Sequence, residues 1–201
     1  MRKRKIVKIK NKNKKHIIIV GCSRCGKTTL SLKLAKLGFV HYKMDSIKRG
    51  IDRNFWDSYQ GEWRMVSPHM AELISRMIRE NKTDIVYNKE YYVIDTLYLY
   101  PSDLAKQDLK DTIIVFLGHA NTTPEEKLKQ IRKYDKNVWS NKLDDEEMKY
   151  GIQRGIDYSI EVKEECEKYG IKYFDVSKNF KKVQKDVYNY ILSELGVWFY
   201  E

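Results

Sequence analysis

Short runs of apolar residues, many of them β-branched or aromatic, alternate along the chain with longer segments in which apolar residues recur at helical spacing. A continuous apolar run predicts a strand of a parallel sheet, because such a strand is buried on both faces. The chain contains five runs of this kind, at residues 17–20, 39–42, 91–95, 112–118 and 171–176. Their alternation with helical segments predicts an α/β fold whose parallel sheet is covered by helices on both faces.

The predicted helices are marked by their spacing and by residues that favour helix ends. Leu30, Leu34 and Leu37 recur at helical spacing after Lys27, and Gly38 follows as a stop signal. The segment 135–145 is polar and is predicted to be irregular. Four further helices are predicted at residues 67–81, 123–134, 146–169 and 183–195, the first two opening with an N-cap and a first-turn proline, Ser67-Pro68 and Thr123-Pro124.

The composition indicates one globular domain. The chain has 201 residues, of which 42% are hydrophobic, enough for one core and too few for two full-sized domains. No apolar run approaches the roughly 18 residues that a membrane-spanning helix needs, and no cleavable signal follows the N-terminus. We therefore expect no membrane contact. The odd cysteine count of three and the lack of a signal predict reduced thiols and a cytoplasmic location.

The formal net charge of +11 is concentrated at the N-terminus. We interpret residues 1–15 as a flexible basic arm and residues 16–201 as the single domain. A solvated arm is the preferred interpretation, and loose RNA binding through phosphate contacts is the alternative. Nine of the first fifteen residues are basic: Arg2, Lys3, Arg4, Lys5, Lys8, Lys10, Lys12, Lys14 and Lys15.

Residues 21–28, here called the phosphate loop, read G-C-S-R-C-G-K-T and match the pattern G-x-x-x-x-G-K-[ST] between a predicted strand and a predicted helix. Glycines let successive backbone N–H groups face phosphates, and the helix N-terminus favours negative charge. Lys27 is expected to contact the β- and γ-phosphates of ATP, and the Thr28 hydroxyl to bind Mg²⁺. The predicted ATP-binding residues here are Gly21, Cys22, Ser23, Arg24, Cys25, Gly26, Lys27, Thr28 and Thr29.

Cys22 and Cys25 form a C-x-x-C pattern inside the phosphate loop. Such a pair can signal zinc binding or redox chemistry, but structural zinc usually needs four nitrogen or sulfur ligands. Cys166 and the four scattered histidines have no matching spacing. The preferred interpretation is therefore that both cysteines are small residues of the loop.

Three further features accompany the phosphate loop: Met44-Asp45-Ser46-Ile47 after the second predicted strand, the third strand ending at Asp95, and an arginine-containing helix before a polar segment. Together they resemble the nucleoside and nucleotide kinase-like branch of P-loop proteins, which includes adenylate kinase, shikimate kinase and chloramphenicol phosphotransferase. The resemblance implies a three-layer α/β/α fold with a five-stranded parallel sheet in the order 2-3-1-4-5. It also implies transfer of the γ-phosphoryl group of Mg·ATP to a hydroxyl or phosphate of a small-molecule acceptor.

The same resemblance assigns roles to individual residues. Asp45 matches a catalytic base that faces the acceptor hydroxyl, although an Asp here could simply cap the following helix. Asp95 matches a carboxylate that holds Mg²⁺ through water, and the alternative is a turn residue at a strand end. Arg132 matches an arginine of a phosphate lid at about residues 132–146, with Arg154 pointing back to the same site, unless either is solvent-facing. Ser177 matches the adenine-facing loop.

An acceptor lid is expected at about residues 46–66, where aromatic and arginine residues gather; Trp63 in this segment could equally belong to the core. The functional alternative is a nucleotide-binding regulatory protein with slow hydrolysis whose basic arm contacts RNA. A GTPase is disfavoured because no N-K-x-D motif is present. The acceptor is not specified, and a monomer and a homodimer remain equally open.

Overall fold

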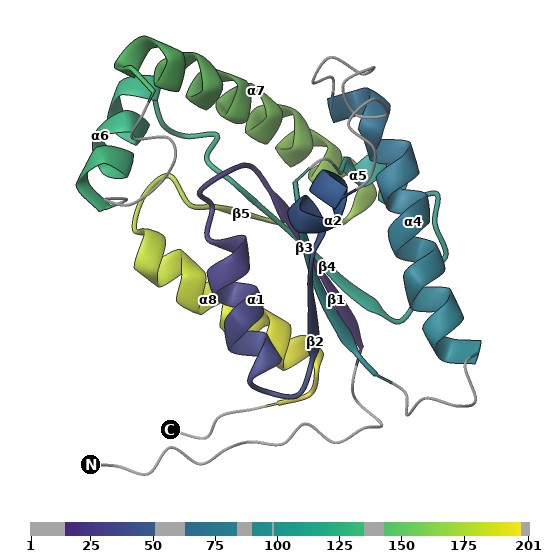
Figure 1. Cartoon of the computed structure of the whole chain (residues 1–201). Helices are drawn as coiled ribbons and strands as arrows, with labels where there is room; N and C mark the ends of the chain where they lie inside the picture. Colours follow the sequence, from purple (N-terminus) through teal and green to yellow (C-terminus); the bar gives the residue numbers. More distant parts are fainter. Residues whose placement is uncertain (1–14, 51–62, 84–89, 98, 135–142, 198–201) are drawn as a thin grey trace, which may run out of the picture.

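A computed structural model describes residues 15–50, 63–83, 90–97, 99–134 and 143–197 of the chain (Figure 1). Most of the basic arm, residues 51–62 of the expected acceptor lid and residues 135–142 of the expected phosphate lid therefore lie outside the described residues. The elements are β1 (His16–Gly21), α1 (Lys27–Ala35), β2 (Val40–Lys43), α2 (Met44–Gly50), α4 (Trp63–Thr83), β3 (Tyr92–Thr96), α5 (Pro101–Leu104), β4 (Thr112–Gly118), α6 (Pro124–Tyr134), α7 (Asp145–Tyr169), β5 (Lys172–Asp175) and α8 (Phe180–Glu194).

The five strands form one sheet in the order β2-β3-β1-β4-β5, and every neighbouring pair is parallel. In Figure 1, α1 and α8 lie on one side of the sheet and α4 lies on the other. The predicted five-stranded parallel sheet, its order and its cover on both faces are confirmed. All five predicted strands are present, and each of their ends lies within one residue of the predicted position.

The central strand β1 shows why continuous apolar runs become strands here. Ile17, Ile18, Ile19 and Val20 all have 0% exposure. A strand between two sheet neighbours with helices on both faces has no solvent side, so β-branched residues fill both faces of it. Burial of these side chains anchors the strand from which the phosphate loop departs.

Parallel pairing brings the carboxyl ends of the central strands to one edge of the sheet. Val20, just before the phosphate loop, is in register with Thr96 at the end of β3. On the other side of β3, Lys43 at the end of β2 is in register with Asp95. Because α2 begins at the next residue, Met44, the first turn of α2 lies at the same edge as the phosphate loop.

The start of α4 departs from the sequence prediction. The helix begins at Trp63, and Pro68 lies inside it rather than in its first turn. The Ser67 hydroxyl accepts a hydrogen bond of 2.8 Å from the backbone N–H of Tyr100, and Ser67 is not an N-cap. Buried Val66 extends the apolar face formed by Met70 and Ile74 across the proline, so packing outweighs the one helical hydrogen bond that proline removes.

Two short helices, α2 and α5, were not among the predicted elements, whereas α7 begins as expected for a capped helix. Asp144 accepts from the Glu147 backbone N–H at 2.8 Å, and the Glu147 side chain accepts in return from the Asp144 N–H. This reciprocal pair satisfies two N–H groups that a helix start leaves without a partner.

Within the described residues, no helix is both long and apolar enough to cross a lipid bilayer.

Candidate functional site

The phosphate loop leaves β1 at a position that only glycine can occupy. A Cβ on Gly21 would lie 2.0 Å from the backbone oxygen of Leu117 on β4, and the φ angle of Gly21 is +154°. Gly26, directly before α1, has φ +84°, and a Cβ there would lie 2.6 Å from the Gln184 side-chain nitrogen. Close packing against backbone therefore requires glycine at position 21, whereas at position 26 the backbone conformation favours glycine and the Gln184 and Phe180 side chains would have to shift for a Cβ.

Side chains from outside and inside the loop hold its backbone. Gln184 of α8 is buried and donates from Nε2 to the Cys25 carbonyl at 2.9 Å. Lys27 is also buried, and its Nζ donates to the Cys22 carbonyl at 2.9 Å. With the N-terminus of α1 behind it, the loop presents an ammonium group and helix N–H groups, a combination that suits a phosphate.

Arg24 has a φ of +62°, in the left-handed region, although it carries a side chain. We expect Arg24→Gly to have a larger free energy of unfolding than Arg24→Ala by about 1 kcal/mol, because the left-handed conformation penalises any Cβ. Urea unfolding of both variants measures this difference. In the exposed position Lys33 of α1, the matched pair should show the opposite order, since alanine is the better helix former.

If Arg24→Ala is at least as stable as Arg24→Gly, the loop does not hold residue 24 in the left-handed conformation.

The Arg24 guanidinium group is partly buried, and this burial lowers its pKa from the usual value. A cation held in this way at the loop is one that a phosphate would stabilise.

Three buried oxygen atoms lie near the phosphate loop without a hydrogen-bond partner among the described residues: Asp45 Oδ1, Asp95 Oδ1 and Thr96 Oγ1. Asp95 and Thr96 have 0% exposure and end the strand next to β1. Asp45 lies in the first turn of α2 rather than before the helix, so its position differs from that of an N-cap. Buried oxygens normally have partners, and an arrangement of unpaired ones fits water or a hard cation.

The second carboxylate oxygen of Asp95 is held by His41, which sequence reasoning missed. His41 Nε2 lies 2.8 Å from Asp95 Oδ2. The two residues are on the paired strands β2 and β3 but are 54 positions apart in the chain, so no local pattern links them. His41 fixes the direction in which the free oxygen of Asp95 points.

A groove of about 810 Å³ runs from the phosphate loop between α6 and α8; we call it the α6–α8 groove. Tyr134 and Phe180, which are 72% and 41% exposed, are its aromatic residues. Ser177 lines it as well, and the Ser177 hydroxyl accepts from the Asn121 backbone N–H at 3.1 Å. The lining residues are Arg24, Lys127, Gln130, Ile131, Tyr134, Ser177, Asn179, Phe180, Lys181 and Lys182.

A smaller cavity of about 150 Å³, here the α7 cavity, adjoins the loop on the α7 side. Arg24 and Lys127 line both this cavity and the α6–α8 groove, so these two cations lie where the two spaces approach each other. Lys127 is only 4% exposed and was not predicted as a site residue. Its signal was the helical spacing to buried Ile131, which puts both residues on the inward face of α6.

The two candidate lid arginines make contacts of their own in this structure. Arg132 donates from Nη2 to Asp145 Oδ1 at 2.7 Å and to the Leu143 carbonyl at 2.9 Å, which joins the end of α6 to the start of α7. The Arg154 guanidinium carbon lies 5.4 Å from the ring centre of Trp63. Neither set of contacts brings these arginines to the phosphate loop, so their phosphate-binding role stays a prediction.

No protein-family model matches the sequence, and no curated protein sequence is significantly similar to it. Among solved structures, shikimate kinase from Bacteroides thetaiotaomicron is similar with a TM-score of 0.51 and 18% identity, covering 90% of this chain and 98% of the other. Shikimate kinase from Acinetobacter baumannii, in complex with shikimate, has a TM-score of 0.50 and 17% identity, covering 89% and 93%. The chain therefore has the fold of the small P-loop kinases.

Proposed function

We propose that this chain is a small kinase that transfers the γ-phosphoryl group of Mg·ATP to a hydroxyl or phosphate of a small-molecule acceptor. The observation that carries the proposal is the pair of carboxylates, Asp45 and Asp95, each with a buried unpaired oxygen at the sheet edge that carries the phosphate loop. Phosphoryl transfer asks a protein mainly to position the reactants and to stabilise charge. A loop for the donor and carboxylates beside it meet both needs.

The nucleotide is proposed to lie along the α6–α8 groove with its phosphates on the phosphate loop. Exposed Tyr134 and Phe180 offer ring faces for a base. Ser177 lines the same groove, where its backbone and hydroxyl groups already bond to Asp175, Gln130 and Asn121. Arg24 and Lys127 line the groove and supply positive charge between base and loop. In this arrangement Lys27 would exchange the Cys22 carbonyl for a phosphate oxygen.

Mg²⁺ fits the oxygen groups at this edge. The Thr28 hydroxyl, in the first turn of α1, and the unpaired Asp95 oxygen, acting through water, are hard ligands of the kind that Mg²⁺ prefers. When bound, the ion would neutralise charge on the β- and γ-phosphates. His41 would keep Asp95 oriented and Asp45 would accept the proton of an acceptor hydroxyl.

The acceptor side is proposed to include Asp45 and the segment 46–66, of which residues 46–50 and 63–66 are described. Trp63 packs edge-on against Tyr158 with ring centres 5.0 Å apart, and it also lines the α7 cavity. Arg64 is paired with Glu161 and Glu165 and stacks 3.6 Å from the Tyr100 ring centre. Trp63 therefore belongs both to the packed interior and to a cavity wall, whereas Arg64 is already neutralised by its neighbours.

The experiment is to incubate the chain with Mg·ATP labelled on the γ-phosphate and a panel of nucleosides, nucleotides, sugars and hydroxylated acids, and to measure label transfer. We expect one class of acceptor to take up label faster than water does. ATP binding with slow hydrolysis and no transfer to any acceptor contradicts the proposal. If RNA binding then falls with salt and disappears without residues 1–15, the regulatory alternative replaces it.

Lys127 provides a prediction specific to this structure. Lys127→Met is expected to weaken Mg·ATP binding about 10-fold, because a buried cation between the groove and the loop is lost while its apolar stem is retained. Isothermal titration calorimetry measures the affinity. Lys129→Met, at an exposed position of the same helix, is the matched control and should bind as the wild type does. Equal affinities for both variants would remove Lys127 from the site.

A further inference from the structure

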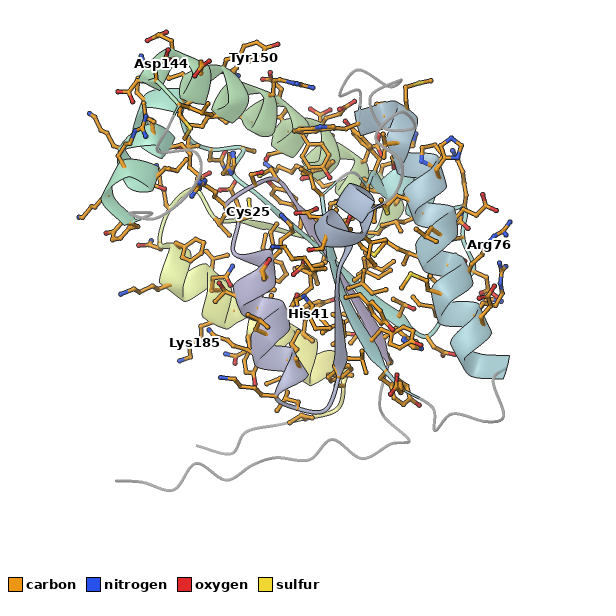
Figure 2. All side chains as sticks on the ribbon, viewed as in Figure 1. Cys25, His41, Arg76, Asp144, Tyr150 and Lys185 are labelled. Carbon is orange, nitrogen blue, oxygen red and sulfur yellow. The ribbon has the colours of Figure 1, made fainter. Side chains whose placement is uncertain are left out.

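Behind the phosphate loop, three donor atoms meet that lie far apart in the sequence. Cys22 Sγ lies 2.9 Å from Cys25 Sγ, and His119 Nδ1 lies 3.1 Å from the first sulfur and 3.4 Å from the second. None of the three residues is more than 3% exposed. Cys25 is labelled in Figure 2.

The fold builds this cluster from two neighbouring strand ends. Gly21 at the end of β1 is in register with Leu117 of β4, so the phosphate loop and His119 leave adjacent strands at the same edge. α7 closes the other side: Ser159 accepts from the His119 backbone N–H at 3.1 Å and donates to the Gly155 carbonyl at 2.6 Å. A Cβ on Gly155 would lie only 3.2 Å from His119 Nε2, so this glycine leaves room for the imidazole.

The two thiols differ in acidity. Burial raises the pKa of Cys22, but hydrogen bonds from Cys25 and His119 outweigh burial and hold that pKa well below its usual value. Burial, followed by the neighbouring Cys22, raises the pKa of Cys25 well above its usual value. Cys22 is therefore the more acidic thiol of the pair, and an imidazole lies beside both sulfurs.

We propose that Cys22, Cys25 and His119 form a binding site for a thiophilic d¹⁰ cation, Cu⁺ or Zn²⁺, behind the phosphate loop. Thiolate and imidazole ligands select such ions, whereas Mg²⁺ takes hard oxygen ligands, so this site is chemically distinct from the proposed Mg²⁺ ligands. All three donor atoms lie within 4.8 Å of one another. Binding would release thiol protons, and the thiolates that form would neutralise the cation that they hold.

The distances allow an ion after a small adjustment. Two sulfurs bound to one tetrahedral ion at about 2.3 Å lie roughly 3.8 Å apart, so the present pair must separate by a little under 1 Å. Three donors complete a trigonal Cu⁺ site. Zn²⁺ needs a fourth ligand, and Ser159 Oγ, 3.4 Å from Cys22 Sγ, is the nearest oxygen given by the structure. A disulfide would use only the two sulfurs and give His119 no part.

Such an ion would stiffen the loop that is proposed to hold ATP. The Cys22 carbonyl accepts from Lys27 and the Cys25 carbonyl accepts from Gln184, so both sulfur-bearing residues already anchor the loop through their backbones. An ion joining their side chains to β4 through His119 adds a third anchor. Metal binding at this site would therefore restrain the conformation of the phosphate loop.

The test uses the full chain, reduced and freed of metal with a chelator, and titrated with Zn²⁺ or with Cu⁺ against a competing chromophoric chelator. One equivalent of one ion should bind, and Co²⁺ should give a sulfur-to-metal charge-transfer band. Cys22→Ser, Cys25→Ser and His119→Asn should each weaken binding about 100-fold or more. Cys166→Ser and His69→Asn are the matched controls, because both residues lie outside the cluster, and they should bind as the wild type does.

Circular dichroism of each variant reports folding, and the Co²⁺ band of the wild type needs no variant at all. Absence of that band together with no binding of Zn²⁺ or Cu⁺ overturns the proposal. Binding that survives in the Cys22→Ser/Cys25→Ser double variant overturns it as well. A Cys22–Cys25 disulfide that resists treatment with a reductant would leave no thiolate for a cation and overturns the proposal too. Mg·ATP binding, measured separately, distinguishes failure here from failure of the proposed kinase function.

Discussion

Replacing Lys27 by methionine should lower kcat/KM for phosphoryl transfer about 1000-fold, equivalent to about 4 kcal/mol of transition-state stabilisation. The Lys27 ammonium is buried in the phosphate loop, where Nζ donates to the Cys22 carbonyl at 2.9 Å. Charge developing on the transferred phosphoryl group would then lose the compensating Lys27 cation. Methionine preserves the buried stem, so the fold should persist. Transfer to the acceptor identified with labelled ATP is the measurement.

The matched control is Lys33→Met in the same helix, at an exposed position. It removes one positive charge from α1 without touching the phosphate loop, so the transfer rate should remain that of the wild type. A Lys27→Met variant that transfers phosphate as fast as the control would show that the loop does not bind the transferred phosphate.

Asp45→Asn should lower kcat by a factor of about 10² to 10⁴ and leave Mg·ATP affinity within about 2-fold, because asparagine cannot accept the acceptor proton. Its Oδ1 is buried without a partner among the described residues, so the group is not committed to a structural hydrogen bond. Initial rates at saturating substrate measure kcat, and calorimetry measures the affinity. Asp186→Asn, at an exposed position on α8, should change neither.

This substitution also separates the two roles considered for Asp45. Asparagine caps a helix about as well as aspartate, so a purely structural Asp45 predicts unchanged stability and unchanged kcat in the variant. A catalytic base predicts a loss of kcat with unchanged stability. The rate therefore decides between the two roles, and an unchanged urea midpoint shows that a loss of kcat does not come from unfolding.

Several elements of the fold were accessible from local pattern. The β1 run could be recognised as a buried strand because it consists of β-branched apolar residues with no polar residue among them. Their 0% exposure agrees with that prediction. The phosphate loop could be recognised because its function needs glycines and a lysine at fixed spacing within eight residues. The predicted start of α4 was wrong because it relied on Ser67-Pro68, which is a local signal. The burial of Val66, which extends the helix beyond the proline, depends on residues distant in the sequence.

The residues missed at the site share a different property. Lys127, His41 and His119 each gain their position from an element distant in the sequence: Lys127 from the groove between α6 and α8, His41 from Asp95, and His119 from the phosphate loop. A lysine or histidine in isolation gives no sign of such a partner. A prediction from sequence spacing alone therefore interpreted Cys22 and Cys25 as small loop residues, because it could not identify His119 as a third ligand.

The sequence by itself determined the alternation of strands and helices and the strand–loop–helix that carries the phosphate loop, because both arise from interactions among residues close along the chain. The tertiary structure alone decided which polar groups meet. Parallel pairing brings the ends of β1, β2, β3 and β4 to one edge, where Asp45, Asp95 and His119 surround the loop. Strand register sets those neighbours, and register is a property of the packed sheet rather than of any one segment.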